Sequence, residues 1–267
     1  MTPRSYLFVP GDRPQRFSKA LASGADAVIV DLEDAVAPAN KDAAREALAG
    51  WLASPGAETI IVRVNGPDSP WFESDCRLAS DSPRVRAVML PKADAHSPWS
   101  AFAGKPVLAL VETATGIDSL DAVVRAAGVQ RVAFGSIDLQ LDLGIEDDDE
   151  ALLYARSRIV LGSRAGGLPA PIDGVCTSLE SGTALDAHVA RARRLGFGGQ
   201  LCIHPVQVSA VNAGFRPTAE QLAWARRVVS ASAMANGAAI AVDGKMVDRP
   251  VLARAQALIE ADRAFGT

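Results

Sequence analysis

Eight short apolar runs recur along the chain, and segments with helical periodicity separate them. The runs occupy residues 5–10, 27–32, 59–64, 86–91, 106–111, 131–136, 171–176 and 200–205. Short, continuously apolar runs are typical of strands in a parallel sheet that is buried on both faces. Eight of them, alternating with helices, predict a closed (β/α)₈ TIM barrel. A doubly wound open sheet has the same local pattern and stays possible on this argument alone.

The segments between the runs predict helices. Residues 41–53 have the clearest pattern, because four apolar side chains fall on one helical face. These side chains are Ala44, Leu48, Trp51 and Leu52. Further helices are predicted over residues 118–128, 151–167 and 182–196. Gly196 suits the end of the last one, where a left-handed backbone often closes a helix.

The chain continues after the eighth run, when the barrel is already complete. Helical patterns cover residues 219–237 and 251–265, and residues 241–250 lie between them. We therefore predict two parts, the barrel over 1–217 and a C-terminal helical extension over 218–267. The extension is expected to cover an end of the barrel or to pack on a neighbouring subunit.

The composition argues against several classes of protein. The formal net charge is −4 and charged residues make up 22%, so no basic surface for nucleic acid is expected. Cys76, Cys176 and Cys202 are widely spaced, which indicates neither a disulfide framework nor a zinc ribbon. No apolar stretch is long enough to span a membrane. These features favour a cytoplasmic protein.

Polar side chains follow six of the eight predicted strands. They are Asp31, Glu33 and Asp34, then Arg63 and Asn65, Lys92, Glu112 and Thr113, Ser136 and Asp138, and finally His204. A single acid after a strand commonly caps the next helix. Active sites of (β/α)₈ barrels lie at the carboxyl ends of the strands, so polar residues at six such ends together predict an active site there.

The acids at these strand ends predict a metal ion. Several carboxylates at one mouth repel each other and raise each other's pKa unless a cation lies among them. A hard divalent ion such as Mg²⁺ suits oxygen ligands and takes one or two carboxylates. Zinc is disfavoured because His96, His188 and His204 show no ligand spacing. His204 is expected to pack at a strand end.

Eight motifs resemble a known family in their order along the chain. They are SYLFVPG (5–11), GADAVIVDLEDAV (24–36), VRVN (62–65), LPKA (90–93), VETATG (111–116), FGSIDL (134–139), GFGGQLCIHPVQV (196–208) and DGKMVDRP (243–250). Together they resemble the citrate lyase β-subunit-like (CitE-like) branch of the HpcH/HpaI aldolase superfamily. The resemblance implies a TIM barrel, assembly as a homotrimer or dimer of trimers, and Mg²⁺-dependent cleavage or formation of C–C bonds in hydroxyacyl thioesters.

The resemblance also implies roles for residues at the strand ends. Glu112 and Asp138 match the two direct Mg²⁺ ligands, and Arg63 matches the residue that grips a substrate carboxylate or enolate oxygen. Glu33 and Asp34 would hold metal-bound waters, although plain loop capping remains an alternative for both. Ser136 is expected to contact the substrate, whereas Asp31 is expected to be structural.

Two further sites follow from the resemblance. Asp248 matches an acid/base aspartate that enters the active site of an adjacent subunit, with Asp243 as a weaker candidate. The alternative is that Asp248 only starts the last helix. Arg13, Arg16 and Lys19 match a segment that meets the phosphate-bearing thioester carrier, but a solvated helix face explains them equally well.

The implied substrate is a β-hydroxyacyl thioester such as malyl-, citramalyl- or citryl-CoA, cleaved into an acyl-CoA and a 2-oxo acid. The sequence leaves open whether the acyl group is carried by coenzyme A, by an acyl carrier protein, or is a free acid. One alternative is an aldolase that acts on a free acid of the pyruvate or oxaloacetate type, and another is a noncatalytic 2-oxo-acid-binding subunit. The HpaI-type branch uses a histidine base near the second strand. This branch fits poorly, because no histidine precedes His96 here.

Overall fold

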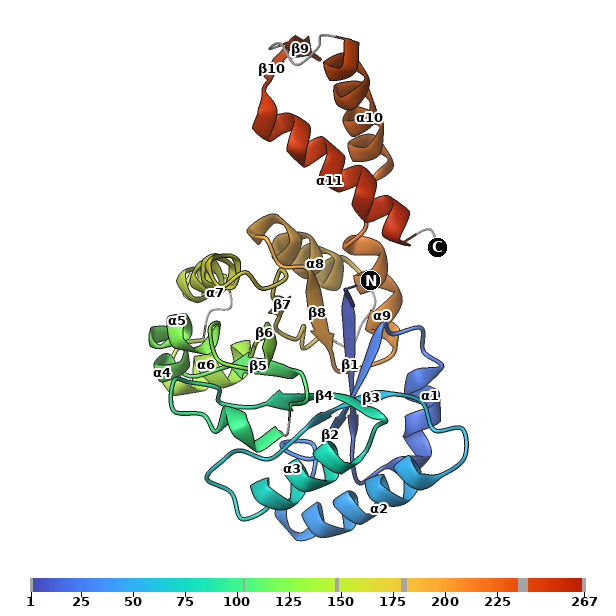
Figure 1. The fold of residues 1–267 in the computed structure, drawn as a ribbon, viewed down its shortest axis with the longest axis vertical. Coiled ribbons are helices and arrows are strands. Elements are labelled where there is room, and N and C mark those ends of the chain that lie inside the picture. Colours follow the sequence, from blue (N-terminus) through green and yellow to red (C-terminus); the bar gives the residue numbers. More distant parts are fainter. Residues whose placement is uncertain (1, 103, 147–148, 179–181, 235–239, 266–267) are drawn as a thin grey trace. The chain divides into compact units, whose positions relative to one another are not determined.

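A computed structural model describes residues 2–102, 104–146, 149–178, 182–234 and 240–265 (Figure 1). The chain divides into two compact units. The first spans Thr2–Asn212 and the second spans Ala213–Thr267. None of the helices in the described ranges is long and apolar enough to cross a membrane.

The first unit contains a closed barrel of eight parallel strands surrounded by helices (Figure 1). The strands are β1 (Ser5–Pro10), β2 (Ala27–Asp31), β3 (Ile60–Arg63), β4 (Val85–Leu90), β5 (Val107–Val111), β6 (Val129–Phe134), β7 (Ile172–Asp173) and β8 (Gly199–Cys202). Strand β1 pairs with β8, with Tyr6 opposite Leu201. This pairing closes the sheet, so the predicted (β/α)₈ barrel is confirmed and the open sheet is excluded.

Burial on both faces explains why the strands read as continuous apolar runs. Ile29 belongs to the cluster that fills the barrel interior. Its neighbours Val28 and Val30 point to the opposite face of the strand and are equally buried, under the surrounding helices. The interior is therefore a packed core rather than a pore, and polar groups can gather only at the strand ends.

The helices of the first unit follow the predictions in most places. They are α1 (Phe17–Leu21), α2 (Lys41–Ala53), α3 (Phe72–Asp81), α4 (Ala114–Asp118), α5 (Leu120–Val123), α6 (Ser136–Leu143), α7 (Leu153–Ala165), α8 (Thr183–Leu195) and α9 (Val206–Gly214). Helix α2 has the predicted bounds, and Gly196 ends α8 with φ 103°.

The predicted helix over 118–128 is wrong in extent. The structure instead has two short helices that break at Ser119. The Ser119 hydroxyl donates a hydrogen bond to the Thr115 carbonyl at 2.7 Å, which is the local competition by which serine disfavours continuous helix.

The second unit consists of two helices and a β-hairpin. Its elements are α10 (Ala219–Met234), β9 (Ile240–Val242), β10 (Lys245–Val247) and α11 (Arg249–Phe265). A small core of its own contains Ala225, Val228, Val247 and Ala255. The hairpin was not predicted, although Asp243 and Gly244, with φ of 52° and 74°, form the Asp-Gly turn that marks such hairpins.

Gly199 permits a close approach of two backbones inside the barrel. A Cβ there would lie 2.6 Å from the carbonyl oxygen of Arg4, and rotation of a side chain cannot relieve that clash. We expect Gly199→Ala to lower the free energy of unfolding by roughly 1–3 kcal/mol. Gly50→Ala, in α2 with open space around it, should raise that free energy by about 0.5–1 kcal/mol. Urea titrations of both variants test this, and a neutral Gly199→Ala would contradict it.

Candidate active site

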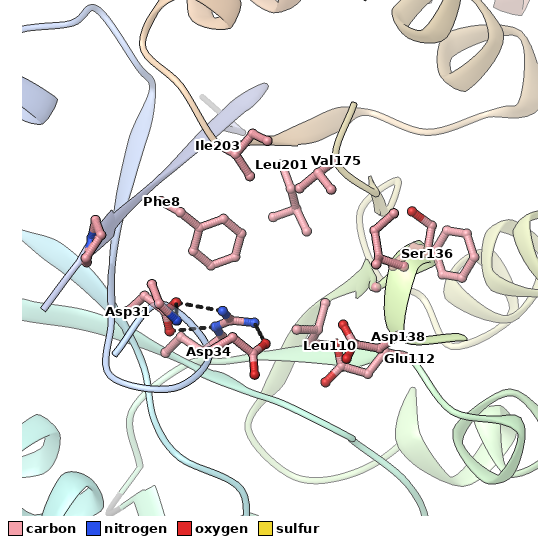
Figure 2. Close-up of a pocket in the computed structure, with 16 residues that line it drawn as sticks. Phe8, Asp31, Asp34, Leu110, Glu112, Ser136, Asp138, Val175, Leu201 and Ile203 are labelled. Carbon is pink, nitrogen blue, oxygen red and sulfur yellow. Dashed lines mark hydrogen bonds and ion pairs between the residues drawn. The ribbon is translucent and has the colours of Figure 1, made fainter. Parts of the chain in front are cut away.

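A cavity of about 360 Å³ opens at the carboxyl ends of the strands. Its apolar wall contains Phe8, Leu110, Phe134, Val175 and Leu201. Its polar groups are Asp31, Asp34, Arg63, Glu112, Ser136 and Asp138. In Figure 2, Glu112 and Asp138 lie together on one side of the cavity, while Asp31 and Asp34 lie together on another. The strand ends at which an active site is predicted therefore surround a cavity.

Glu112 and Asp138 face this cavity as a carboxylate pair. Glu112 follows β5 and is 2% exposed. Burial, together with the charges of Glu33 and Asp138, raises the pKa of Glu112 to about 8. Burial and the charge of Asp34 also raise the pKa of Asp138, which lies in the first turn of α6. Both acids are thus held where a negative charge is costly.

The pair fits a hard divalent cation. Glu112 Oε1 accepts a hydrogen bond from the Lys92 backbone N–H at 2.9 Å. The other oxygen, Oε2, is buried and has no hydrogen-bond partner among the described residues. No group of three or more metal-binding side chains occurs among those residues. Mg²⁺ needs only one or two carboxylates, because water and substrate supply the other positions.

Arg63, at the end of β3, lies among three acids. Its Nε and Nη2 donate to the two oxygens of Asp31 at 2.7 and 2.6 Å. Its Nη1 lies 3.1 Å from Asp34 and 3.3 Å from Glu33. Burial opposes the charge of Arg63, but the three neighbouring carboxylates raise its pKa above the usual value. A bidentate pair of this kind fixes the plane of the guanidinium, so Asp31 orients Arg63, as its predicted structural role requires.

The loop that carries the acids is held by buried donors. Lys41 Nζ donates to the carbonyls of Leu32 at 2.8 Å and Glu33 at 2.7 Å. Asn65 Nδ2 donates to the same Leu32 carbonyl. The Asp31 carboxylate also accepts the backbone N–H of Glu33. Because its backbone is tied from three directions, the loop presents its carboxylates in one arrangement.

Glu33 and Asp34 are adjacent in sequence but line different cavities. Asp34 lines the cavity with Glu112, whereas Glu33 lines a neighbouring one of about 660 Å³. Glu33 is 6% exposed and accepts a hydrogen bond from Lys92 Nζ at 3.2 Å. Burial and nearby acids raise the pKa of Glu33 despite Arg63 and Lys92. Its partners are therefore the two cations of the site.

Two glycines bring the strand ends close together. A Cβ on Gly135 would lie 2.4 Å from the Cβ of Glu112, and one on Gly174 would lie 2.4 Å from Ser136 Oγ. Ser136 is buried at the start of α6, and its hydroxyl has no hydrogen-bond partner in the described part of the chain. Sequence reasoning missed both glycines, although each directly follows a strand.

Besides Glu33, four of the predicted site residues do not line the central cavity of the barrel unit. Arg13, Arg16 and Lys19 are exposed around the start of α1, and Arg13 Nε lies 3.7 Å from Asp12. Asp248 belongs to the second unit, is exposed, and accepts a hydrogen bond from the Val251 N–H at 3.2 Å. It therefore caps α11, as the structural alternative expects, and its catalytic role stays a prediction.

Two other residues differ from the sequence analysis. His204 is exposed rather than packed, because it lies beyond the end of β8 and accepts the Val206 N–H. Lys92 was assigned no role, yet it contacts both Glu33 and Glu112. Its position at the end of β4, in LPKA, was the available signal.

Comparisons with known proteins agree with the fold. The model of the HpcH/HpaI aldolase/citrate lyase family matches residues 4–205. A citrate lyase subunit beta-like protein from Mycobacterium tuberculosis is 38% identical over 95% of this chain and 93% of its own. A (3S)-malyl-CoA thioesterase from Cereibacter sphaeroides is 33% identical over 96% and 95%. The crystal structure of CitE from M. tuberculosis in complex with magnesium, acetoacetate and coenzyme A covers 98% of both chains, with 36% identity and a TM-score of 0.88.

Breaking the buried Asp31–Arg63 pair should strongly destabilise the fold. Removing one partner of a buried ion pair commonly costs about 3–5 kcal/mol of the free energy of unfolding. Because Glu33 and Asp34 remain near Arg63, we expect the loss in Asp31→Asn to be at the lower end, about 3 kcal/mol. Asp42→Asn is the control, because it removes an ion pair with Arg45 in which the Asp42 side chain is 76% exposed. Its loss of unfolding free energy should stay below about 1 kcal/mol. Guanidinium titrations of both variants measure the difference, and equal losses would contradict the role given to Asp31.

Proposed function

The chain belongs to the HpcH/HpaI aldolase/citrate lyase family, and from this premise we propose that it is a Mg²⁺-dependent carbon–carbon lyase. Its proposed substrate is a β-hydroxyacyl thioester such as malyl-, citramalyl- or citryl-CoA, and its products are an acyl-CoA and a 2-oxo acid. The observation that carries the proposal is that Glu112, Asp138 and Arg63 line one cavity.

Glu112 and Asp138 are the proposed ligands of Mg²⁺. The free oxygen of Glu112 and its raised pKa support this, as does the magnesium of the M. tuberculosis CitE crystal structure. Bound there, the ion would neutralise charge on the carboxylate and hydroxyl oxygens of the substrate. Glu33 and Asp34 would orient the waters around it, as outer-shell acids commonly do.

Cleavage requires a base and a cation at defined positions. Asp248 of an adjacent subunit would take the proton of the substrate hydroxyl. The C–C bond to the carbinol carbon then breaks, and its electron pair moves to the thioester as an enolate. Arg63 would stabilise that negative charge. Its contact with Asp34, whose side chain is 56% exposed, is the one that a substrate oxygen can most readily replace.

The remaining groups of the cavity suit the substrate's other end. The Ser136 hydroxyl lies at the N-terminus of α6, where a helix favours an anionic group, so this end would hold the carboxylate of the 2-oxo acid. The apolar wall, with Phe8 and Leu201, would keep water from the enolate. Protonation of the enolate carbon then completes the acyl-CoA.

The thioester handle and the assembly extend the proposal. The exposed Arg13, Arg16 and Lys19 would meet phosphate groups of coenzyme A or of an acyl carrier. The proposed assembly is a homotrimer or a dimer of trimers, and self-association is supported by apolar side chains on α6 and α7 that are open to solvent in one chain. These include Leu141, Tyr154 and Leu161, which are 82%, 72% and 66% exposed. A cytoplasmic location stays a prediction.

Hydrolysis of the thioester is a second candidate function, favoured by the similarity to a (3S)-malyl-CoA thioesterase. The two reactions differ in their products, because a lyase releases a 2-oxo acid and leaves the thioester intact, whereas a thioesterase releases free coenzyme A. Incubation with malyl-, citramalyl- and citryl-CoA, with Mg²⁺ or with EDTA, followed by assays for 2-oxo acid and free thiol, tests the proposal. Cleavage of free hydroxy acids instead would favour the aldolase, and binding of oxaloacetate without any turnover would favour a noncatalytic subunit.

Glu112→Gln should abolish Mg²⁺-dependent activity. The amide cannot replace a charged ligand, and because loss of an outer-shell partner alone costs 10–100-fold, we expect turnover to fall by more than about 100-fold. The fold should remain, so the unfolding midpoint in EDTA should not drop. Glu46→Gln, on an exposed position of α2, is the matched control. Full activity of Glu112→Gln would remove the metal site from the proposal.

Asp248 should act across a subunit boundary. Asp248→Asn removes the proposed base but keeps a good helix cap, and it should be inactive, as should Glu112→Gln. Random exchange between equal amounts of the two variants should restore about one site in four, which a kinetic assay after mixing detects. Glu260→Gln, at an exposed position of α11, serves as a control that retains activity. No recovery, despite exchange proven by mass spectrometry of tagged subunits, would argue for a base from the same chain.

A further inference from the structure

Lys92 has an unusual backbone for its residue type. Lys92 and Asp243 are the two non-glycine residues with positive φ in the described ranges, at 51° and 52°. Asp243 sits in an Asp-Gly hairpin turn, where such angles are expected. Lys92 follows Pro91 in a turn at the end of β4, where the residue with positive φ is usually glycine or asparagine rather than lysine. Backbone strain of this sort persists only when the surrounding structure holds it.

The neighbouring backbone holds Lys92 in this conformation. The N–H of Ala93 donates to the Leu110 carbonyl at 3.0 Å, so the chain beyond β4 is tied to β5. Ala93 is fully buried, and its carbonyl packs so closely on Gly116 that a Cβ there would lie 2.6 Å away. The peptide on the C-terminal side of Lys92 therefore has little freedom to turn.

The strained residue contacts two acids of the site. Its backbone N–H donates to Glu112 Oε1 at 2.9 Å, and its Nζ donates to Glu33 Oε1 at 3.2 Å. The first bond occupies one oxygen of Glu112. The second oxygen, Oε2, is left without a hydrogen-bond partner among the described residues and lies beside Gly135.

We propose that Lys92 is a positioning residue whose left-handed backbone aims its N–H at Glu112 and thereby orients the carboxylate for a divalent cation. The inference rests on the proposed function in one respect, which is that Glu112 binds the metal ion. The backbone N–H, and not the ammonium group, is the part that acts on Glu112. The ammonium group is instead the partner of Glu33.

Substitutions at position 92 separate the effect of the backbone conformation on metal binding from the effect of the side-chain charge. K92G and K92N tolerate a left-handed backbone, K92M keeps the length of lysine without its charge, and K92V strongly disfavours positive φ. The readout is the dissociation constant of Mn²⁺, used as a probe for Mg²⁺ and measured by electron paramagnetic resonance without substrate.

We expect K92G and K92N to bind Mn²⁺ within about twofold of the wild type, since one charge-assisted contact to Glu33 is all they lose. K92M should bind at least as tightly, because a positive charge leaves the neighbourhood of the ion. K92V should bind at least about tenfold more weakly, because it loses a hydrogen bond to a carboxylate. The Mn²⁺ affinities of the variants should therefore rank by how well residue 92 tolerates a left-handed backbone, and not by its charge.

A matched control is available in the second unit. D243G and D243V change the same backbone preference at a residue of the second unit that is not a proposed metal ligand, so they should shift the unfolding midpoint without changing Mn²⁺ affinity. If K92V does not fold, the amide proton of residue 92 provides the test by nuclear magnetic resonance. It should resonate downfield in the wild type and in K92G, and move upfield in Glu112→Ala.

Two results would overturn the inference. One is a folded K92V with wild-type Mn²⁺ affinity, and the other is a K92M as impaired as K92V, which would assign the effect to the ammonium group. An amide resonance that is insensitive to Glu112→Ala would count equally against it. Glu112→Gln with unchanged Mn²⁺ affinity would remove the ligand assignment itself, so failure of the proposed function is distinguishable from failure of this inference.

Discussion

The repulsion among buried carboxylates at the carboxyl end of the barrel is the constraint on which this structure depends. Asp31, Glu33, Asp34, Glu112 and Asp138 come from the ends of β2, β5 and β6 and share one region. Burial of an unpaired charge is costly, so each of these acids either has a cation nearby or has a raised pKa. Arg63 provides most of this compensation from within the chain, since its guanidinium contacts three of the acids.

The compensation is unequal around the barrel, and this asymmetry points to the function. On the side of β2 to β4, Arg63 and Lys92 pair with Asp31, Glu33 and Asp34. On the side of β5 and β6, the structure records no ion pair for Glu112 or Asp138 among the described residues, and the pKa of both carboxyls is raised. A cation from solution would relieve the repulsion between these two acids. Proteins that bind Mg²⁺ through few carboxylates leave room in this way for water and substrate.

Much of the fold, but less of the site, was predictable from the sequence. The eight strands were predictable because burial on both faces leaves continuous apolar runs, and Glu112, Asp138 and Arg63 were identified because strand ends converge. The different surroundings of Glu33 and Asp34 were not, because adjacent loop residues have no periodicity that assigns them to a cavity. Asp31 pairs with Arg63, 32 positions away, and the angle of Lys92 depends on Ala93 and β5. Such contacts between distant segments leave no local pattern.

The residues of this cavity give a physical explanation for the similarity to both lyase-type and thioesterase proteins. A lyase and a thioesterase for malyl thioesters must hold the same carboxylate and hydroxyl oxygens, so both can use an identical pair of metal-binding acids and the same arginine. They differ in the atom from which a base removes a proton, which is the substrate hydroxyl in cleavage and a water in hydrolysis. The barrel cavity of this chain provides the common part, with two acids, Arg63 and an apolar wall. The choice between the reactions therefore depends on the base and on access of water, and Asp248 is the base that we propose for cleavage.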